Sequence, residues 1–118
     1  MADIDLPPHT VSLASADDLA FIRDTLLRLG LDTEDLKPQQ FIVVRNQGRP
    51  VAFGRIKPYR KTYELGGIVV IEEEQGKGWG RLVVQELIRR FPQDEVYVVT
   101  VLPQFFEKLG VPSHRDLA

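Results

Sequence analysis

Three glycines alternate with other residues in the stretch QGKGWG at residues 75–80, between an apolar run and an amphipathic segment. Glycine lets the backbone approach a ligand closely, and the first N–H groups of a following helix have no intrahelical partner. A turn of this kind favours binding of an anion, most often a phosphate. Lys77 and Arg81 flank the glycines and add positive charge. The spacing therefore predicts a phosphate-binding loop over residues 75–81.

Two well-known phosphate loops do not fit this spacing. A Walker loop ends in Gly-Lys followed by Ser or Thr, whereas Trp79 follows Gly78 here and offers no hydroxyl for magnesium. A dinucleotide-binding GxGxxG loop that starts at Gly76 needs a glycine where Arg81 stands. Phosphate binding and a plain tight connection both remain open for this loop taken alone.

The segments on either side of the loop must hold it in position. Residues 65–71 form a nearly unbroken apolar run, which predicts a strand covered on both faces. The pair Gly66-Gly67 inside this run indicates a bulge or a close backbone approach. After the loop the period becomes that of a helix, with an apolar face made of Val83, Val84, Leu87, Ile88 and Phe91.

The rest of the chain supplies further elements. Residues 10–14 predict a strand, and the Ser15 and Asp18 spacing predicts the capped start of a helix that ends before Gly30. A second, short helix is expected from Thr33 to the residue before Pro38. Other patterns predict a hairpin of residues 41–45 and 50–57 around a turn at 46–48, a strand at 96–102 and a short helix at 104–109.

Length and composition exclude several classes of protein. A chain of 118 residues fits one small domain, and we expect a flexible lead-in over 1–9 followed by a single domain over 10–118. The absence of cysteine excludes disulfides, thiol nucleophiles and cysteine metal sites, and His9 and His114 do not support a metal pair. A net charge of −2 gives no basic field for nucleic acid. With no apolar run near the ~20 residues of a membrane span, we expect a soluble, cytoplasmic protein without a membrane partner.

The spacing of Gln75, Gly78 and Gly80 resembles the Q/R-x-x-G-x-G/A loop of the GNAT N-acetyltransferase superfamily. The resemblance extends to the preceding strand at Ile68–Val70 and to the segment QFFEKLG at 104–110. Residues 29–36 also resemble the helical lid of its small amino-acid-type members. The resemblance implies an α/β (α+β) fold with a mixed, mostly antiparallel sheet flanked by helices, in the order β-α-α-β-β-β-α-β-α with a shortened C-terminus.

The resemblance also implies a reaction, the transfer of an acetyl group from acetyl-CoA to a primary amine of a small molecule, such as an amino acid or an analogue, without a metal. It implies that the backbone N–H groups of residues 68–70 polarise the thioester oxygen. Glu64, at the start of the strand, is the candidate base, and an exposed strand-end charge is the alternative for it. The acidic run at 72–74 is interpreted as a solvated turn. The implied cofactor-binding residues are Ile68, Val69, Val70, Gln75, Gly76, Lys77, Gly78, Trp79, Gly80, Arg81 and Phe106.

The helix expected at 104–109 departs from the family pattern. Many relatives place a tyrosine there to reprotonate the thiolate, whereas this chain has Phe105 and Phe106. Phenylalanine cannot donate a proton, so water, Tyr63 or Tyr97 would have to do so. Two functions therefore stay open: a small-molecule N-acetyltransferase, and a non-catalytic acyl-CoA-binding or regulatory module.

The chain end suggests an oligomer. After Gly110 only residues 111–118 follow, too few for the two further strands that the resembled family has there. The strand expected at 96–102 would then present an open apolar edge. We expect a homodimer along this strand and the helix after it. The alternative is a monomer whose last residues fold back as one short strand.

Overall fold

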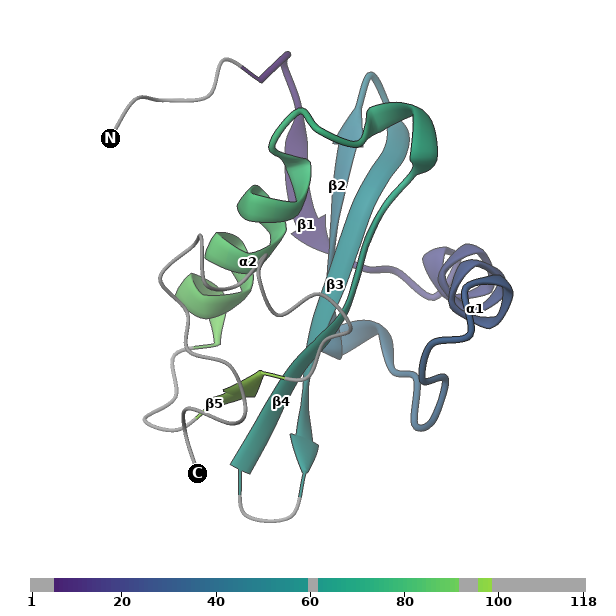
Figure 1. Cartoon of the computed structure of the whole chain (residues 1–118), viewed down its shortest axis with the longest axis vertical. Helices are drawn as coiled ribbons and strands as arrows, with labels where there is room; N and C mark the ends of the chain where they lie inside the picture. Colours follow the sequence, from purple (N-terminus) through teal and green to yellow (C-terminus); the bar gives the residue numbers. More distant parts are fainter. Residues whose placement is uncertain (1–5, 60–61, 92–95, 99–118) are drawn as a thin grey trace.

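The computed structural model describes residues 6–59, 62–91 and 96–98, which are drawn in colour in Figure 1. Their elements form one five-stranded sheet in the order β1-β2-β3-β4-β5. Strands β1 to β4 are antiparallel to their neighbours, and β5 runs parallel to β4. The predicted mixed, mostly antiparallel α/β sheet is therefore confirmed. The elements are β1 (Thr10–Leu13), α1 (Asp18–Arg28), η1 (Pro38–Gln40), β2 (Phe41–Asn46), β3 (Arg49–Tyr59), β4 (Thr62–Val70), η2 (Glu72–Glu74), α2 (Trp79–Arg90) and β5 (Val96–Val98).

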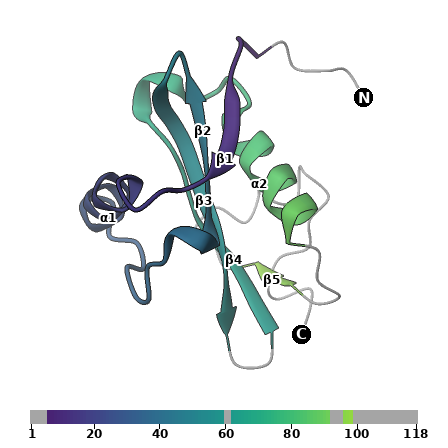
Figure 2. The ribbon, with the colours of Figure 1, turned by 180° about the vertical axis from the view of Figure 1, so that it is seen from behind.

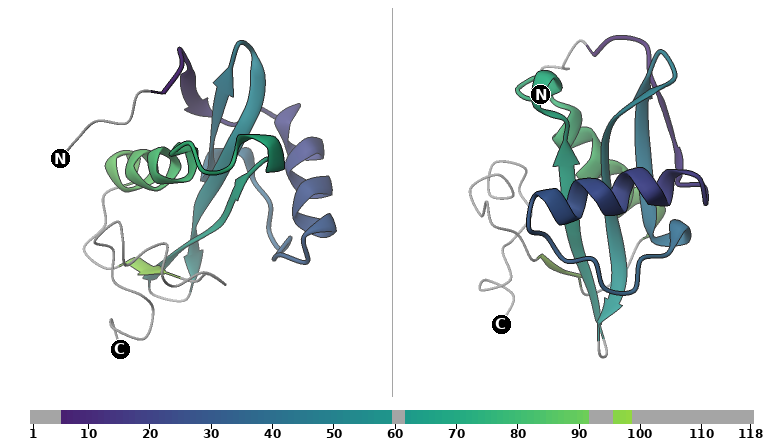
Figure 3. Two further views of the ribbon diagram at one scale, coloured as in Figure 1. Left: turned by 45° about the horizontal axis from the view of Figure 1, so that its top comes forward. Right: turned by 90° about the vertical axis from the view of Figure 1, so that its right-hand side faces the viewer.

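Helices α1 and α2 cover opposite faces of the sheet (Figure 3). Side chains alternate along β2, so that Phe41 and Val43 pack toward α1 while Ile42 and Val44 pack toward α2. All four are buried because both faces are covered, which explains why the central strands appear as unbroken apolar runs. Of the apolar face predicted for α2, Ile88 is exposed.

The ends of α1 follow the local sequence. Ser15 N–H donates to the Asp18 carboxylate at 2.8 Å, and Asp18 N–H donates back to Ser15 Oγ at 3.3 Å, as predicted for a capping box. At the other end Gly30 has a φ of 72°, and Leu31 N–H donates to Leu26 O at 2.9 Å. These bonds satisfy backbone groups that the helix itself leaves unpaired.

The prediction of a short helix from Thr33 to the residue before Pro38 is wrong. This segment makes a turn, in which Glu34 N–H donates to Asp32 Oδ1 at 2.8 Å and Asp35 has a φ of 54°. The carbonyl oxygens of Glu34 and Asp35 accept hydrogen bonds from Arg55 of β3. A partner distant in the sequence therefore takes the carbonyls that a helix would use.

The bulge predicted at Gly66-Gly67 is confirmed. Phe53 pairs with Val69 and Arg55 pairs with Gly66, so two residues of β4 stand opposite Gly54. Gly67 has a φ of 61°, which glycine adopts readily. A Cβ atom at Gly54 would lie 2.5 Å from Ile68 Cδ1, so the missing side chain makes room for the bulged strand. The predicted hairpin between β2 and β3 is also confirmed.

Strand β5 lies beside the first residues of β4, as the view from behind shows (Figure 2). Residues 99–102 of the expected strand, the expected helix at 104–109 and the chain end lie outside the described residues. The homodimer therefore stays a prediction. Within 6–59, 62–91 and 96–98, no helix is long and apolar enough to cross a membrane, and no cluster of side chains suited to a metal ion occurs.

Candidate active site

The glycine loop follows η2 and leads directly into α2. Gly76 and Gly78 have φ angles of 83° and 103°, and a Cβ atom at Gly76 would meet nothing within 4 Å. Gly78 is the N-cap of α2, where no side chain caps the helix. The first backbone hydrogen bond of the helix is donated by Leu82 N–H to Gly78 O at 3.1 Å. The N–H groups of the first turn before Leu82 are therefore oriented to bind an anion.

Glu74 anchors this loop, although sequence reasoning placed it in a solvated turn. Its Oε1 accepts hydrogen bonds from the indole N–H of Trp79 at 3.0 Å and from Lys77 Nζ at 3.2 Å. These bonds, with that from Trp79 the largest contribution, lower the pKa of Glu74. Glu72 and Glu73 are exposed, as predicted for the acidic run.

The side chains of two loop residues that the resemblance implies as cofactor-binding, Trp79 and Gln75, contact other parts of the protein. The Trp79 side chain is fully buried in the core under α2, and its indole N–H is bonded to Glu74. The amide of Gln75 donates to Val70 O at 3.0 Å and ties the loop to the end of β4. In both cases the side chain stabilises the loop, and a contact of these residues with a cofactor stays a prediction.

The end of β4 presents backbone groups next to the loop. Ile71 N–H donates to Val51 O at 3.0 Å, and residues of an antiparallel strand alternate in direction, so the N–H and C=O of Val70 point away from β3. The described part of β5 pairs with β4 only at Tyr63–Leu65, away from this end. The side chains of Ile68 and Val70 pack into the core on the α2 side of the sheet, and that of Val69 packs into the core on the α1 side.

Glu64 lies inside β4, which begins at Thr62, so it is not an exposed strand-end charge. Glu64 is half-buried, and in the register of the sheet it is directly opposite Lys57 of β3 and Tyr97 of β5. Directly paired residues share a face of the sheet. Glu64 therefore lies on the same face as Lys57, which is the face that α1 covers.

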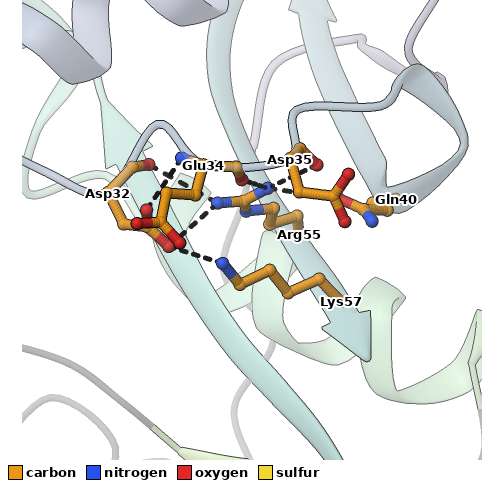
Figure 4. A network of polar contacts seen from close by, with 6 residues as sticks. All are labelled: Asp32, Glu34, Asp35, Gln40, Arg55 and Lys57. Atoms are coloured by element: carbon orange, nitrogen blue, oxygen red, sulfur yellow. Dashed lines mark hydrogen bonds and ion pairs between the residues drawn. The ribbon is translucent and has the colours of Figure 1, made fainter. Parts of the chain in front are cut away.

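A polar network on this face was not identified from the sequence (Figure 4). Its centre is Arg55, whose side chain is only 3% exposed. Arg55 NH1 donates to Glu34 O at 3.0 Å, Asp35 O at 3.3 Å and Gln40 Oε1 at 3.1 Å, and NH2 donates to Asp32 Oδ2 at 3.2 Å. The network fixes the segment between α1 and β2 against β3.

Lys57 completes the network, because its Nζ donates to the same Asp32 oxygen at 2.6 Å. Burial would raise the pKa of Asp32, but hydrogen bonds from Lys57 and from Glu34 N–H, together with the charges of Lys57 and Arg55, lower it overall. The signal available in the sequence was two cations at alternate positions, Arg55 and Lys57, in the otherwise apolar run at 50–57.

Replacing Arg55 tests this network. We expect Arg55→Met to lower the free energy of unfolding by about 2 kcal/mol, because the carbonyls of Glu34 and Asp35 and the side chain of Gln40 lose a charged donor in a partly buried place. Urea denaturation measures the change. Arg49→Met is the matched control, since the Arg49 side chain is 58% exposed and its one ion pair among the described residues is with the exposed Glu73. Equal effects of the two substitutions would contradict a structural role for the Arg55 network.

A family model described as the acetyltransferase (GNAT) family matches residues 5–111. No curated protein is similar enough in sequence to count as a relative. Among solved structures, the chain is similar to N-acetylglutamate synthase from Neisseria gonorrhoeae, complexed with coenzyme A and N-acetyl-glutamate. The TM-score is 0.72 at 14% identity, over 88% of this chain and 28% of that one. The chain thus spans little more than a quarter of that relative.

Two other similar structures are matched over more of their length. Rv2747 from Mycobacterium tuberculosis, in complex with CoA, has a TM-score of 0.73 at 22% identity, over 86% of this chain and 70% of that one. Glucosamine-6-phosphate N-acetyltransferase from Arabidopsis thaliana has a TM-score of 0.63 at 18% identity, over 90% of this chain and 92% of that one. At these identities the likeness concerns the fold.

Proposed function

The chain belongs to the acetyltransferase (GNAT) family, and from this premise we propose that it transfers an acetyl group from acetyl-CoA to a primary amine of a small molecule. The observation that carries the proposal is the arrangement along β4. An uncapped helix start with two left-handed glycines lies beyond its last residue, and Glu64 lies near its first. The rise per residue of a strand places Glu64 and Val70 about 20 Å apart.

The residues of the loop suit the donor. Gly76 leaves the backbone open, Gly78 has a left-handed φ, and the N–H groups at the start of α2 are suited to hold a pyrophosphate. Arg81 and Lys77, which also pairs with Glu74, flank the glycines. Acetyl-CoA, when bound, supplies an activated thioester at the far end of a long arm. The distance along β4 agrees with a donor whose phosphates and reactive carbonyl are widely separated. A cofactor contact by Phe106 is also proposed, but that residue lies outside the described part of the chain.

The chain itself has two tasks at the reacting end. Backbone N–H groups of residues 68–70, of which Ile68 is nearest to Glu64 along β4, donate to the oxygen that becomes negative during transfer. Glu64 takes a proton from the acceptor's ammonium group, directly or through water, which gives the nucleophilic amine. The leaving sulfur takes its proton from water or from a tyrosine. Tyr97 is paired with Glu64 in the register of β5 and β4, whereas Tyr63 packs its side chain into the core on the α2 side.

The test is a turnover assay with acetyl-CoA and a panel of primary amines, in which free thiol and the acetylated product are both measured. We expect release of thiol that depends on the amine and equals the product formed. Binding of CoA without turnover on any amine would favour the second function, a non-catalytic acyl-CoA-binding or regulatory module. The presence of Phe105 and Phe106 in place of a tyrosine supports this alternative.

A further inference from the structure

Charged side chains from two strands and one loop gather on the face of the sheet that carries Glu64. Arg55 and Lys57 share a single carboxylate, that of Asp32, so these three groups carry one surplus positive charge. Asp35 pairs instead with Lys37, at 3.5 Å. Glu64 is the nearest further carboxylate along β4. Its charge acts on Arg55, although no hydrogen bond or ion pair joins it to another residue of the described part.

Lys57 has more N–H donors than acceptors among the described residues. An ammonium group has three N–H donors, and Asp32 is the one acceptor that Lys57 has among the described residues. The Lys57 side chain is only 12% exposed, so a ligand bound to it is less screened by water than one bound to a surface lysine. The bond from Asp32 also fixes the position of Nζ, which lowers the entropy cost of binding.

The register places Lys57 next to the proposed base. Lys57 and Glu64 are directly opposite on β3 and β4, a pairing that brings the Cβ atoms to about 5 Å on the same face. An acceptor whose amine is at Glu64 therefore has its neighbouring atoms near Lys57. In an α-amino acid the group one carbon away from the amine nitrogen is a carboxylate, which is the complement of the ammonium group.

We propose that Lys57, held in place by Asp32 and supported by Arg55, binds the carboxylate of the acceptor, and that the acceptor is an α-amino acid. This inference rests on the proposed acetyl transfer. The charges agree with it: Glu64 matches the acceptor's ammonium group, and the surplus positive charge of the network matches its carboxylate. A carboxamide keeps the shape of the carboxylate without its charge, and a simple amine lacks the carboxylate altogether.

The test compares an α-amino acid with its carboxamide and with the amine that lacks the carboxyl group. We expect the native protein to show a KM about tenfold lower for the acid than for the amide, as for loss of one charged partner in a recognition site. Lys57→Met should raise the KM for the acid about tenfold, change kcat little, and leave the KM for the amide and for acetyl-CoA within about twofold. Lys57→Arg should restore part of the loss.

Lys37→Met is the matched control, because Lys37 belongs to the segment before β2, its side chain is 60% exposed, and its ion pair within the described part of the chain is with Asp35. It should leave all KM values unchanged. Equal use of acid and amide by the native protein overturns the inference and leaves the proposed function standing, and this comparison needs no variant. A Lys57→Met protein that loses acid and amide turnover equally also overturns it. No turnover on any acceptor overturns the inference and the proposed function together.

Discussion

Glu64→Gln is expected to lower kcat/KM by about 10²-fold, the usual size of a general-base contribution. Glutamine keeps the size and the hydrogen-bonding capacity of the side chain but does not accept the proton of an ammonium group. Because Glu64 lies about 20 Å along β4 from the residues next to the loop, the affinity for CoA should stay nearly unchanged. Steady-state kinetics with the best acceptor, together with calorimetry of CoA binding, measures both quantities.

The matched control for this substitution is Glu72→Gln. Glu72 is exposed in η2, carries the same charge and lies away from Glu64 along the chain. It should leave kcat/KM within about twofold. Full activity of Glu64→Gln would transfer the role of base to water or to another carboxylate. A parallel loss of CoA affinity would show instead that Glu64 supports the fold of the site.

The second large effect is expected from Gly78→Val, which should weaken CoA binding by about ten- to a hundredfold. A β-branched residue is strongly disfavoured at a φ of 103°, so the N-cap of α2 would have to change its conformation. That change misdirects the first N–H groups of the helix, and the loss of one charge-assisted hydrogen bond to a phosphate is sufficient for the expected weakening. Calorimetric titration with CoA measures it.

Gly48→Val separates loss of the binding site from general backbone strain. Gly48 also has a positive φ, 79°, and lies in the hairpin between β2 and β3, where a Cβ atom would meet nothing within 4 Å. We expect this control to be destabilised by a similar strain but to bind CoA normally. If Gly78→Val kept the native affinity, the loop would not be the phosphate site, and family membership alone would support CoA binding.

The sequence by itself determined the elements whose cause is local. The glycines at 76 and 78, the capping pair Ser15 and Asp18, and the residue Gly30 each act through the conformation of their own few residues. The change of period between β4 and α2 depends only on the order of apolar side chains. For this reason the loop, the bulge at Gly67 and the strand and helix around them could all be predicted, and the family resemblance rested on the same contiguous residues.

Only the tertiary structure decided what happens where distant residues meet. The segment at 33–37 is a turn because Arg55, from a later strand, takes the carbonyls of Glu34 and Asp35. Register places Lys57 beside Glu64, and the burial of Trp79 in the core, with its indole N–H on Glu74, makes Glu74 an anchor of the loop. Such contacts depend on which faces pack together and on which residues become buried. Local periodicity does not encode either property, because each is fixed only when the whole sheet has formed.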